Sequence, residues 1–456
     1  MSAVGKNLPH DSAKGHVSGE STYIDDIAPV KGELLVDFYY LPVSHARVKQ
    51  IRLEAAARVE GVVALYTYKD IPGQNLFGSV YHDEVLLVEE EIQFMGQPLV
   101  LIAAQSMAAI KQARQAIEVL WEPLENILSI DAAKKHKSFI GPPRRIKRGN
   151  PQEAFHQAEH IIEGVFHNQG QDHFYLESQA AIVYPGEFDQ IVIHSSTQNP
   201  TEVQEVVAHL LGLSMNRVVC ITKRMGGGFG GKECQATHPA AMAALVAHKT
   251  KRAARMIYNK DHDMQVTGKR HPFQNDYKVG FTSDGLITAL HVDLFSDGGA
   301  AADLSTAVMA RAMTHTDNAY YIPNVEIIGI VCKTHFPPNT AFRGFGGPQG
   351  AVVIENIIEE IAAYLHKDAL EIRKLNLYDC ADRNVTPYGQ TILENSLPEI
   401  IEKLETSSNY YQRREEVAKF NAQSQTHLKG LACTLVKFGI SFNTKFLNQA
   451  NALVNI

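Results

Sequence analysis

Two glycine-rich segments hold the residues best suited to bind a large anionic ligand. The first, RMGGGFGGKE, covers residues 224–233 and has five glycines in six positions, which lets the backbone approach a bulky or anionic group closely. The second, NTAFRGFGGPQG, covers residues 339–350 and places Arg343 and Phe345 just before a helical pattern. An arginine beside backbone amides at a helix N-terminus favours anions, and a phenylalanine offers a stacking face. The two loops predict one anionic cofactor held from both sides; two unrelated helix-entry turns are the alternative.

The first loop also matches two nucleotide-binding patterns, each with a defect. Gly226, Gly228 and Gly231 fit GxGxxG, but the acid expected about 20 residues later is missing. Gly226 to Lys232 fits GxxxxGK, but Glu233 stands where a magnesium-binding Ser or Thr is needed, and its carboxylate would repel phosphates. The alternative function of a NAD-dependent dehydrogenase is therefore supported by the GxGxxG pattern alone.

Other candidate residues are isolated in the sequence. Gln198, in the turn SSTQNP, can offer its side-chain amide to a ligand or can simply stabilise the turn. Arg311 lies in the apolar helical stretch VMARAMTH, which makes it a candidate buried arginine. His156, Glu159 and His160 spell the zinc pattern HxxEH, but the helix is short and runs into a β-like segment, so we interpret the spacing as chance.

These residues lie on a chain of mixed α and β pattern. Short β-rich runs alternate with amphipathic stretches over the first 130 residues. Residues 134–148 contain seven Lys or Arg and two prolines, which predicts an exposed linker; a basic patch for an anionic partner is the alternative.

Beyond that segment, helices and strands continue to alternate. Strands are expected over 181–195 and 217–223, with a helix between them that Asn199 caps and Pro200 begins. Further helices are expected over 235–248, 348–366 and 397–420. The sequence stops within an apolar β-like run, from which we expect an incomplete domain at its end.

Composition excludes several classes of protein. The 456 residues allow about three domains. The net charge of −7 argues against nucleic-acid binding, and no apolar run reaches the roughly 18 residues of a membrane span. Five widely spaced cysteines without a CxxC pair indicate reduced thiols, a cytoplasmic location and no iron–sulfur cluster within this chain.

Several long motifs, in order along nearly the whole chain, carry a family resemblance. Besides the two glycine loops they are GHVSGESTYIDDI (15–27), GQDHFYLESQ (170–179), STQNPTEVQ, GKRHPF (268–273), KFGISF and FLNQA. The chain resembles the molybdenum hydroxylases, and within them the molybdopterin-binding subunit of the xanthine dehydrogenases. The resemblance implies an α+β fold, in which an α/β hammerhead domain precedes a mixed α/β molybdenum-cofactor-binding region.

The resemblance also divides the chain into segments. We expect a tail over 1–14, the hammerhead domain over 15–125, a basic, proline-containing linker over 126–149, a first molybdopterin-binding domain over 150–390, and a helix with the start of a second, incomplete molybdopterin-binding domain over 391–456.

The resemblance also implies roles for individual residues within the shared motifs. Five residues match cofactor contacts: Gln198, Gly228, Phe229, Gly230 and Arg343. Of these, Gln198, Phe229 and Arg343 would support the molybdenum site through hydrogen bonds or backbone contacts.

Three further residues match substrate contacts. Phe345 would stack on a flat heteroaromatic ring. Glu233 and Arg311 would recognise the edges of a purine and stabilise charge on its ring. Related aldehyde oxidases usually differ at the last two positions, so keeping both favours a purine.

The implied reaction is hydroxylation of hypoxanthine and xanthine to urate, with electrons leaving through 2Fe-2S clusters and FAD to NAD. Those groups would lie on a separate small subunit. The family's subunit continues for about as long again, with another cofactor loop, a second aromatic beside the substrate and a general-base glutamate. No catalytic base is therefore expected in this chain, and Glu233 is not promoted to that role. We expect a truncated or split form, inactive alone, whose missing half is supplied by another chain, lost, or outside this sequence; a non-catalytic remnant or assembly module is the alternative.

Overall fold

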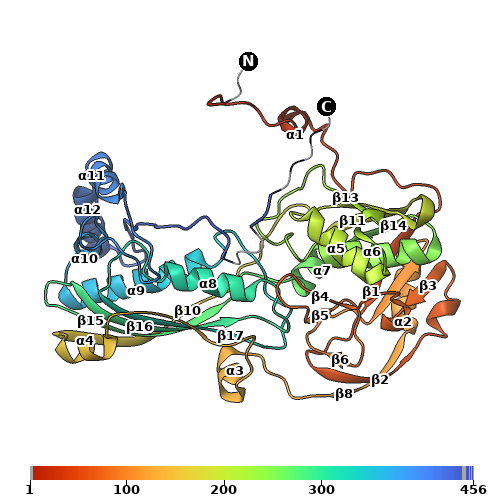
Figure 1. The fold of residues 1–456 in the computed structure, drawn as a ribbon, viewed down its shortest axis with the longest axis horizontal. Helices are drawn as coiled ribbons and strands as arrows, with labels where there is room; N and C mark the ends of the chain where they lie inside the picture. Colours follow the sequence, from red (N-terminus) through yellow and green to blue (C-terminus); the bar gives the residue numbers. More distant parts are fainter. Residues whose placement is uncertain (1–3, 444–447, 451, 453, 455–456) are drawn as a thin grey trace.

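The chain folds into two lobes that lie side by side in the computed structural model (Figure 1). The structure describes residues 4–443, 448–450, 452 and 454. Its N-terminal segment, with helix α1 (Ala13–Ser18), extends away from both lobes.

A seven-stranded sheet forms the centre of the first lobe, in the order β13-β12-β11-β14-β1-β7-β3. Its strands are β1 (Leu34–Tyr39), β3 (Val62–Tyr66), β7 (Val100–Ala104), β11 (Ala180–Pro185), β12 (Ile191–Ser195), β13 (Val218–Ile221) and β14 (Ala254–Ile257). The pairs β1–β14 and β12–β13 are parallel, and the other pairs are antiparallel. Segments from both ends of the lobe's sequence therefore share one sheet.

Helices α5 (Pro200–Leu211) and α6 (Thr237–Thr250) cover this sheet, and α7 (Lys260–Val266) follows β14. Helix α6 is alanine-rich and buried over most of its length, so it packs closely between α5 and the strands.

The remainder of the first lobe is built from residues before 124. Helix α2 (Met107–Ala116) packs near β7, and a three-stranded sheet has the order β6-β2-β8. These smaller strands are β2 (Ala46–Arg52), β6 (Glu91–Ile92) and β8 (Glu118–Pro123), beside the short pair β4 (Leu76–Phe77) and β5 (Glu84–Val85).

The second lobe is a five-stranded sheet with helices on both faces. The strand order is β10-β15-β16-β17-β9, from β9 (Arg144–Arg148), β10 (His160–Asn168), β15 (Phe273–Phe281), β16 (Ile287–Asp297) and β17 (Asn324–Cys332). Helices α8 (Ser305–His315) and α9 (Gly347–Leu365) cover one face, and α4 (Pro151–Gln157) the other (Figure 1). Three more helices continue the chain: α10 (Ala369–Asn376), α11 (Leu397–Ser408) and α12 (Tyr410–Gln423).

The mixed α and β composition was predicted correctly, but the interpretation of residues 134–148 as an exposed linker was wrong. This segment contains the end of α3 (Ile130–His136) and strand β9, which pairs antiparallel with β17 at the edge of the sheet. Its arginines find local partners, because Arg144 donates to Thr306 O at 3.1 Å and Arg145 pairs with Glu326. Four of the seven basic side chains are thus bound to the second lobe, those of Lys134, Arg144, Arg145 and Arg148.

Two other expected elements are divided in the structure. The strand expected over 181–195 is a hairpin of β11 and β12, and the helix expected over 397–420 is broken at Asn409, which has a φ of +50°. Asparagine tolerates this left-handed conformation better than most residues, so it can separate two helices.

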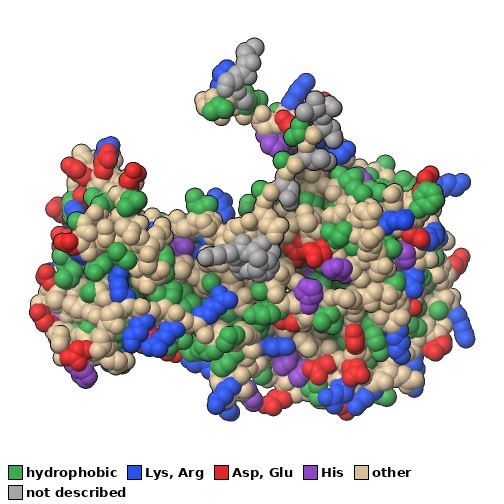
Figure 2. All heavy atoms as spheres, in the orientation of Figure 1, with side chains coloured by type: hydrophobic (Ala, Val, Ile, Leu, Met, Phe, Trp, Pro, Cys, Tyr) green, Lys and Arg blue, Asp and Glu red, His purple; other side chains and the backbone are tan. Residues whose placement is uncertain are grey.

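Charge is dispersed over the visible surface. On the face shown in Figure 2, Lys and Arg are interspersed with Asp and Glu. Among the described residues no helix is long and apolar enough to cross a membrane.

Candidate functional site

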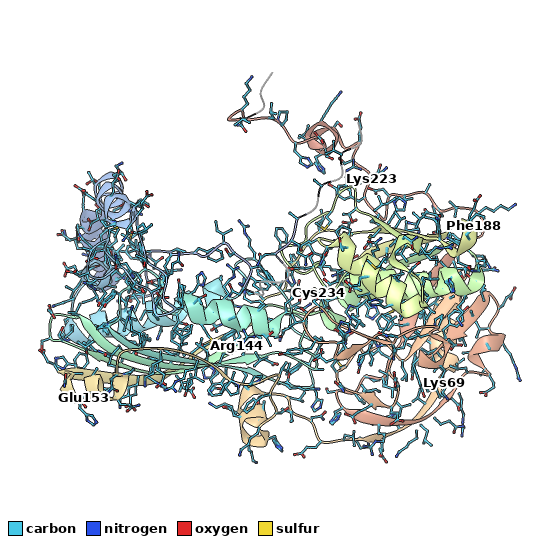
Figure 3. The ribbon with its side chains drawn as sticks, viewed as in Figure 1. Lys69, Arg144, Glu153, Phe188, Lys223 and Cys234 are labelled. Atoms are coloured by element: carbon cyan, nitrogen blue, oxygen red, sulfur yellow. The ribbon has the colours of Figure 1, made fainter. Side chains whose placement is uncertain are left out.

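The two glycine loops meet where the two lobes join. The first loop connects β13 to α6, and the second connects β17 to α9. Arg343 N–H donates to Phe229 O at 2.9 Å, which ties one loop directly to the other. A Cβ built on Gly230 would lie 2.7 Å from Ala341 O, so the two backbones approach as closely as glycine allows. Cys234, just after the first loop, lies between the lobes in Figure 3.

Gln198, in the turn between β12 and α5, holds the first loop. Its Oε1 accepts hydrogen bonds from Gly230 N–H at 2.8 Å and Lys232 N–H at 3.4 Å. A Cβ on Gly228 would reach within 2.6 Å of the same oxygen. The Gln198 side chain is exposed, and its Nε2 donates to no group in the described part of the chain. The amide is therefore fixed at its oxygen, and its N–H groups are available to a ligand.

Phe229 and Arg343, beside this amide, also have exposed side chains. Phe229 has a φ of +53°, and its side chain is 48% exposed despite lying among glycines. The Arg343 guanidinium is exposed and forms no hydrogen bond or ion pair with the described residues.

The second loop is supported by two residues that the sequence analysis did not single out. Arg270 Nη2 donates to Arg343 O at 3.1 Å, and its guanidinium lies 3.8 Å from the centre of the Phe342 ring. His173 Nε2 donates to Ala341 O at 2.7 Å, and burial lowers the pKa of His173 to about 4, so the ring is neutral at pH 7. The motifs GKRHPF and GQDHFYLESQ contain both residues and were the available signal.

These groups fit the molybdopterin-type cofactor that the sequence resemblance implies. Exposed amide and guanidinium donors without internal partners, on Gln198 and Arg343, flank the contact between the two loops. Such donors suit an anionic, oxygen-rich group.

Glu233 is the last residue of the first loop. Its carboxylate forms no hydrogen bond or ion pair within the described chain. Burial, followed by the nearby charge of Glu202, raises the pKa of Glu233 to about 7. Glu202 is itself held by Asn199 Nδ2 at 2.8 Å and by the Ser79 hydroxyl. Near neutral pH the Glu233 carboxyl can therefore act as donor or acceptor.

This raised pKa predicts a pH-dependent stability. Glu233 keeps its proton in the folded chain up to about pH 7 but loses it near pH 4.5 when unfolded. The unfolded state therefore binds fewer protons in this window, so the free energy of unfolding falls as the pH rises from 4.5 to 7, by about 1 to 3 kcal/mol from this group. Melting temperatures across that range measure the fall, and Glu233→Gln should flatten the slope. An unchanged slope in Glu233→Gln would contradict the assignment.

Phe345 lies between an aromatic ring and a guanidinium. The Phe442 ring centre is 5.2 Å away, tilted by 47°, and the Arg311 guanidinium carbon is 5.7 Å from the Phe345 centroid. A second aromatic ring, which we expected only in the family's continuation, therefore contacts Phe345 within this chain. The motif KFGISF contains Phe442, and only the folded contact with Phe345 reveals its place.

Arg311 is buried on α8 and already has partners. Its Nη2 donates to Ser441 O at 2.5 Å, and its Nη1 donates to Gly439 O. Its Nε is buried without a hydrogen bond. Glu233 and Arg311 form no direct hydrogen bond or ion pair, but the apolar cluster of Cys234, Leu304 and Ala341 connects the segment of Glu233 to Phe345 and Phe442.

Comparison with protein-family models gives two matches. Residues 18–125 match the hammerhead domain described as "Aldehyde oxidase and xanthine dehydrogenase, a/b hammerhead domain", and residues 132–377 match the molybdopterin cofactor-binding domain.

Curated relatives and solved structures agree with these matches. The chain is 41% identical to a xanthine dehydrogenase of Drosophila subobscura over 99% of its length, and 41% identical to xanthine dehydrogenase 1 of Arabidopsis thaliana over 100%. It spans about a third of those relatives, 34% in both cases. The aldehyde oxidoreductase of Desulfovibrio gigas superposes with a TM-score of 0.84 at 27% identity, over 90% of this chain and 47% of that one. Quinoline 2-oxidoreductase of Pseudomonas putida shares the fold, with a TM-score of 0.82 at 22% identity, over 92% and 56%.

Proposed function

The chain belongs to the aldehyde oxidase and xanthine dehydrogenase family of molybdopterin-binding oxidoreductases, and from that premise we propose that it forms part of a purine-hydroxylating molybdenum enzyme. The substrates would be hypoxanthine and xanthine, and the product urate. The observation that carries the proposal is the Glu233 carboxyl, without a partner among the described residues, next to an apolar cluster that packs on Phe345, whose ring lies 5.7 Å from the Arg311 guanidinium carbon.

The two loops would hold the cofactor. Gln198 Nε2 and the Arg343 guanidinium would donate hydrogen bonds to it, and the exposed Phe229 ring would contact it. Glycines 228 and 230 allow Gln198 and the second loop to lie close to the first loop. When bound, a cofactor of this kind supplies a two-electron oxidation that adds an oxygen atom from water to a carbon of the substrate.

The chain's own residues would orient the purine. Phe345 and Phe442 offer apolar faces to a flat ring. The Glu233 carboxyl, half protonated near pH 7, can match either a donor or an acceptor on the ring edge. The Arg311 guanidinium, close to Phe345, would stabilise negative charge that develops on the ring during attack. The residue that acts as general base would lie outside this sequence.

Electron transfer would require a partner. The five cysteines described in the structure are free and dispersed, and no group of His, Cys, Asp and Glu among the described residues could hold a metal ion. We propose a small subunit or further domains that carry 2Fe-2S clusters and FAD and reduce NAD, and a cytoplasmic location for the assembly.

A comparison of two substrates tests the assignment of a purine as the substrate. The chain purified with its native partners is assayed with xanthine and with an aldehyde, each with NAD. We expect urate and NADH from xanthine, with a kcat/KM at least about tenfold above that for the aldehyde. Turnover of the aldehyde alone would refute the purine assignment.

A non-catalytic module of the same family is the second candidate. The contacts of Arg311 with Gly439 O and Ser441 O favour it, because they occupy donors that a substrate would need. Such a module would contain no molybdenum and turn over neither substrate.

A further inference from the structure

Glu177 contacts both ends of the first glycine loop. At the start of the loop, Gly226 N–H donates to Glu177 Oε2 at 2.7 Å, and Glu177 N–H donates to Gly226 O at 3.1 Å. At the end of the loop, Lys232 Nζ lies 3.4 Å from the same Oε2. One carboxylate oxygen therefore joins residues 226 and 232 across the loop.

The ion pair is buried and fully bonded. The Lys232 side chain is 0% exposed and that of Glu177 10%. Lys232 Nζ donates to Ser196 Oγ at 2.7 Å, and that hydroxyl donates to Glu177 Oε2 at 2.6 Å. The Lys232 ammonium also lies 4.7 Å from the centre of the Tyr175 ring. Burying two charges costs desolvation energy that their attraction often fails to recover, so such a pair is weak evidence for stability alone.

The position of the pair points to a different role. Gln198 holds the middle of the loop at Gly230, while Glu177 and Lys232 hold its two ends. The stretch between these anchors contains Phe229, and Glu233 follows Lys232 directly. Displacement of either end of the loop would therefore move two groups together: the backbone proposed to face the cofactor, and the Glu233 carboxyl proposed to face the substrate.

We propose that Lys232 and Glu177 are positioning residues, which hold the 226–232 loop in the geometry that receives the cofactor. The identity of the cofactor rests on the proposed function, whereas the restraint on the loop does not. Neither residue needs to touch the cofactor or the substrate, because both act through the loop backbone.

Hydrogen exchange and metal analysis of Lys232→Met test the proposal in the chain purified with its native partners. We expect amides 226–232 to exchange at least about tenfold faster than in the wild type, because the loop loses the anchor at its end. The molybdenum content per chain should fall by more than about half for the same reason. Lys232→Arg, which keeps the charge, should recover part of both losses.

Arg373→Met is the matched control. It breaks another buried ion pair, with Glu355 at 2.8 Å and side-chain exposures of 1% and 14%, in the second lobe. It should lower the melting temperature without changing exchange at 226–232. Equal exchange of the loop in Lys232→Met and Arg373→Met would overturn the proposal.

A second variant covers the case in which Lys232→Met does not fold. Glu177→Gln keeps an oxygen for Gly226 N–H but removes the charge that faces Lys232, and faster exchange of the loop is expected. Unchanged exchange in Glu177→Gln would overturn the proposal. Absence of molybdenum from the wild type would refute the proposed function, while the exchange comparison would still decide the role of the pair.

Discussion

Gly230→Val is expected to reduce the molybdenum content of the purified chain to below about a tenth of the wild-type value. Gly230 has a φ of +98°, which strains any residue with a β-branched side chain. Its added Cβ would lie 2.7 Å from Ala341 O and 2.8 Å from the carbonyl carbon. These are backbone atoms of the second loop, so relief of the clash requires the two loops to separate. Elemental analysis of the chain, purified with its native partners, measures the effect.

Gly389→Val separates the clash from backbone strain alone. Gly389 has a φ of +87°, and a Cβ there would meet no atom within 4 Å. This variant should carry the same strain and keep its molybdenum. Normal molybdenum in Gly230→Val, or equal losses in the two variants, would contradict the assignment of the cofactor site to the contact between the loops.

The double variant Glu233→Val with Arg311→Met is expected to lower kcat/KM for xanthine by at least about 100-fold in the assembled enzyme. Hydrogen bonds to charged groups contribute roughly 1.5–3 kcal/mol each, and loss of two such contacts corresponds to a factor of this size. Molybdenum content should stay within about twofold of the wild-type value, because neither side chain is among those assigned to cofactor contact. Steady-state kinetics, alongside metal analysis, measures both quantities.

Arg52→Met with Glu118→Val provides the control for this double variant. These residues form an exposed ion pair, at 3.5 Å, between β2 and β8. Exposed pairs contribute little to stability, so turnover should not change. Unchanged purine turnover in the Glu233 and Arg311 variant would refute the substrate-binding role of these residues.

Local signals in the sequence predicted the elements around the site well. Asn199 caps α5, where its side chain accepts from Glu202 N–H, and Pro200 occupies the first turn, as predicted from their spacing. The two glycine loops were predicted to hold one cofactor from both sides. Their direct contact, in which a Cβ on Gly230 would meet Ala341 O, was not predicted.

Features that depend on distant partners could not be predicted in this way. Residues 144–148 read as a linker because their charges suit solvent, yet they form β9 by pairing with β17, nearly 180 residues later. The contact of Phe442 with Phe345 and that of Lys232 with Glu177 join positions far apart in sequence. Hydrophobic periodicity in the sequence does not predict such contacts, because they depend on the packing of the whole lobe.

The most direct test of the account is the molybdenum content of the wild-type chain, purified with its native partners and assayed with xanthine and NAD. We predict about one molybdenum per chain together with urate formation, because both glycine loops and their free donors are in place. A chain that retains this fold but contains no molybdenum, and that forms no urate, would contradict the account and identify a module without the family's chemistry.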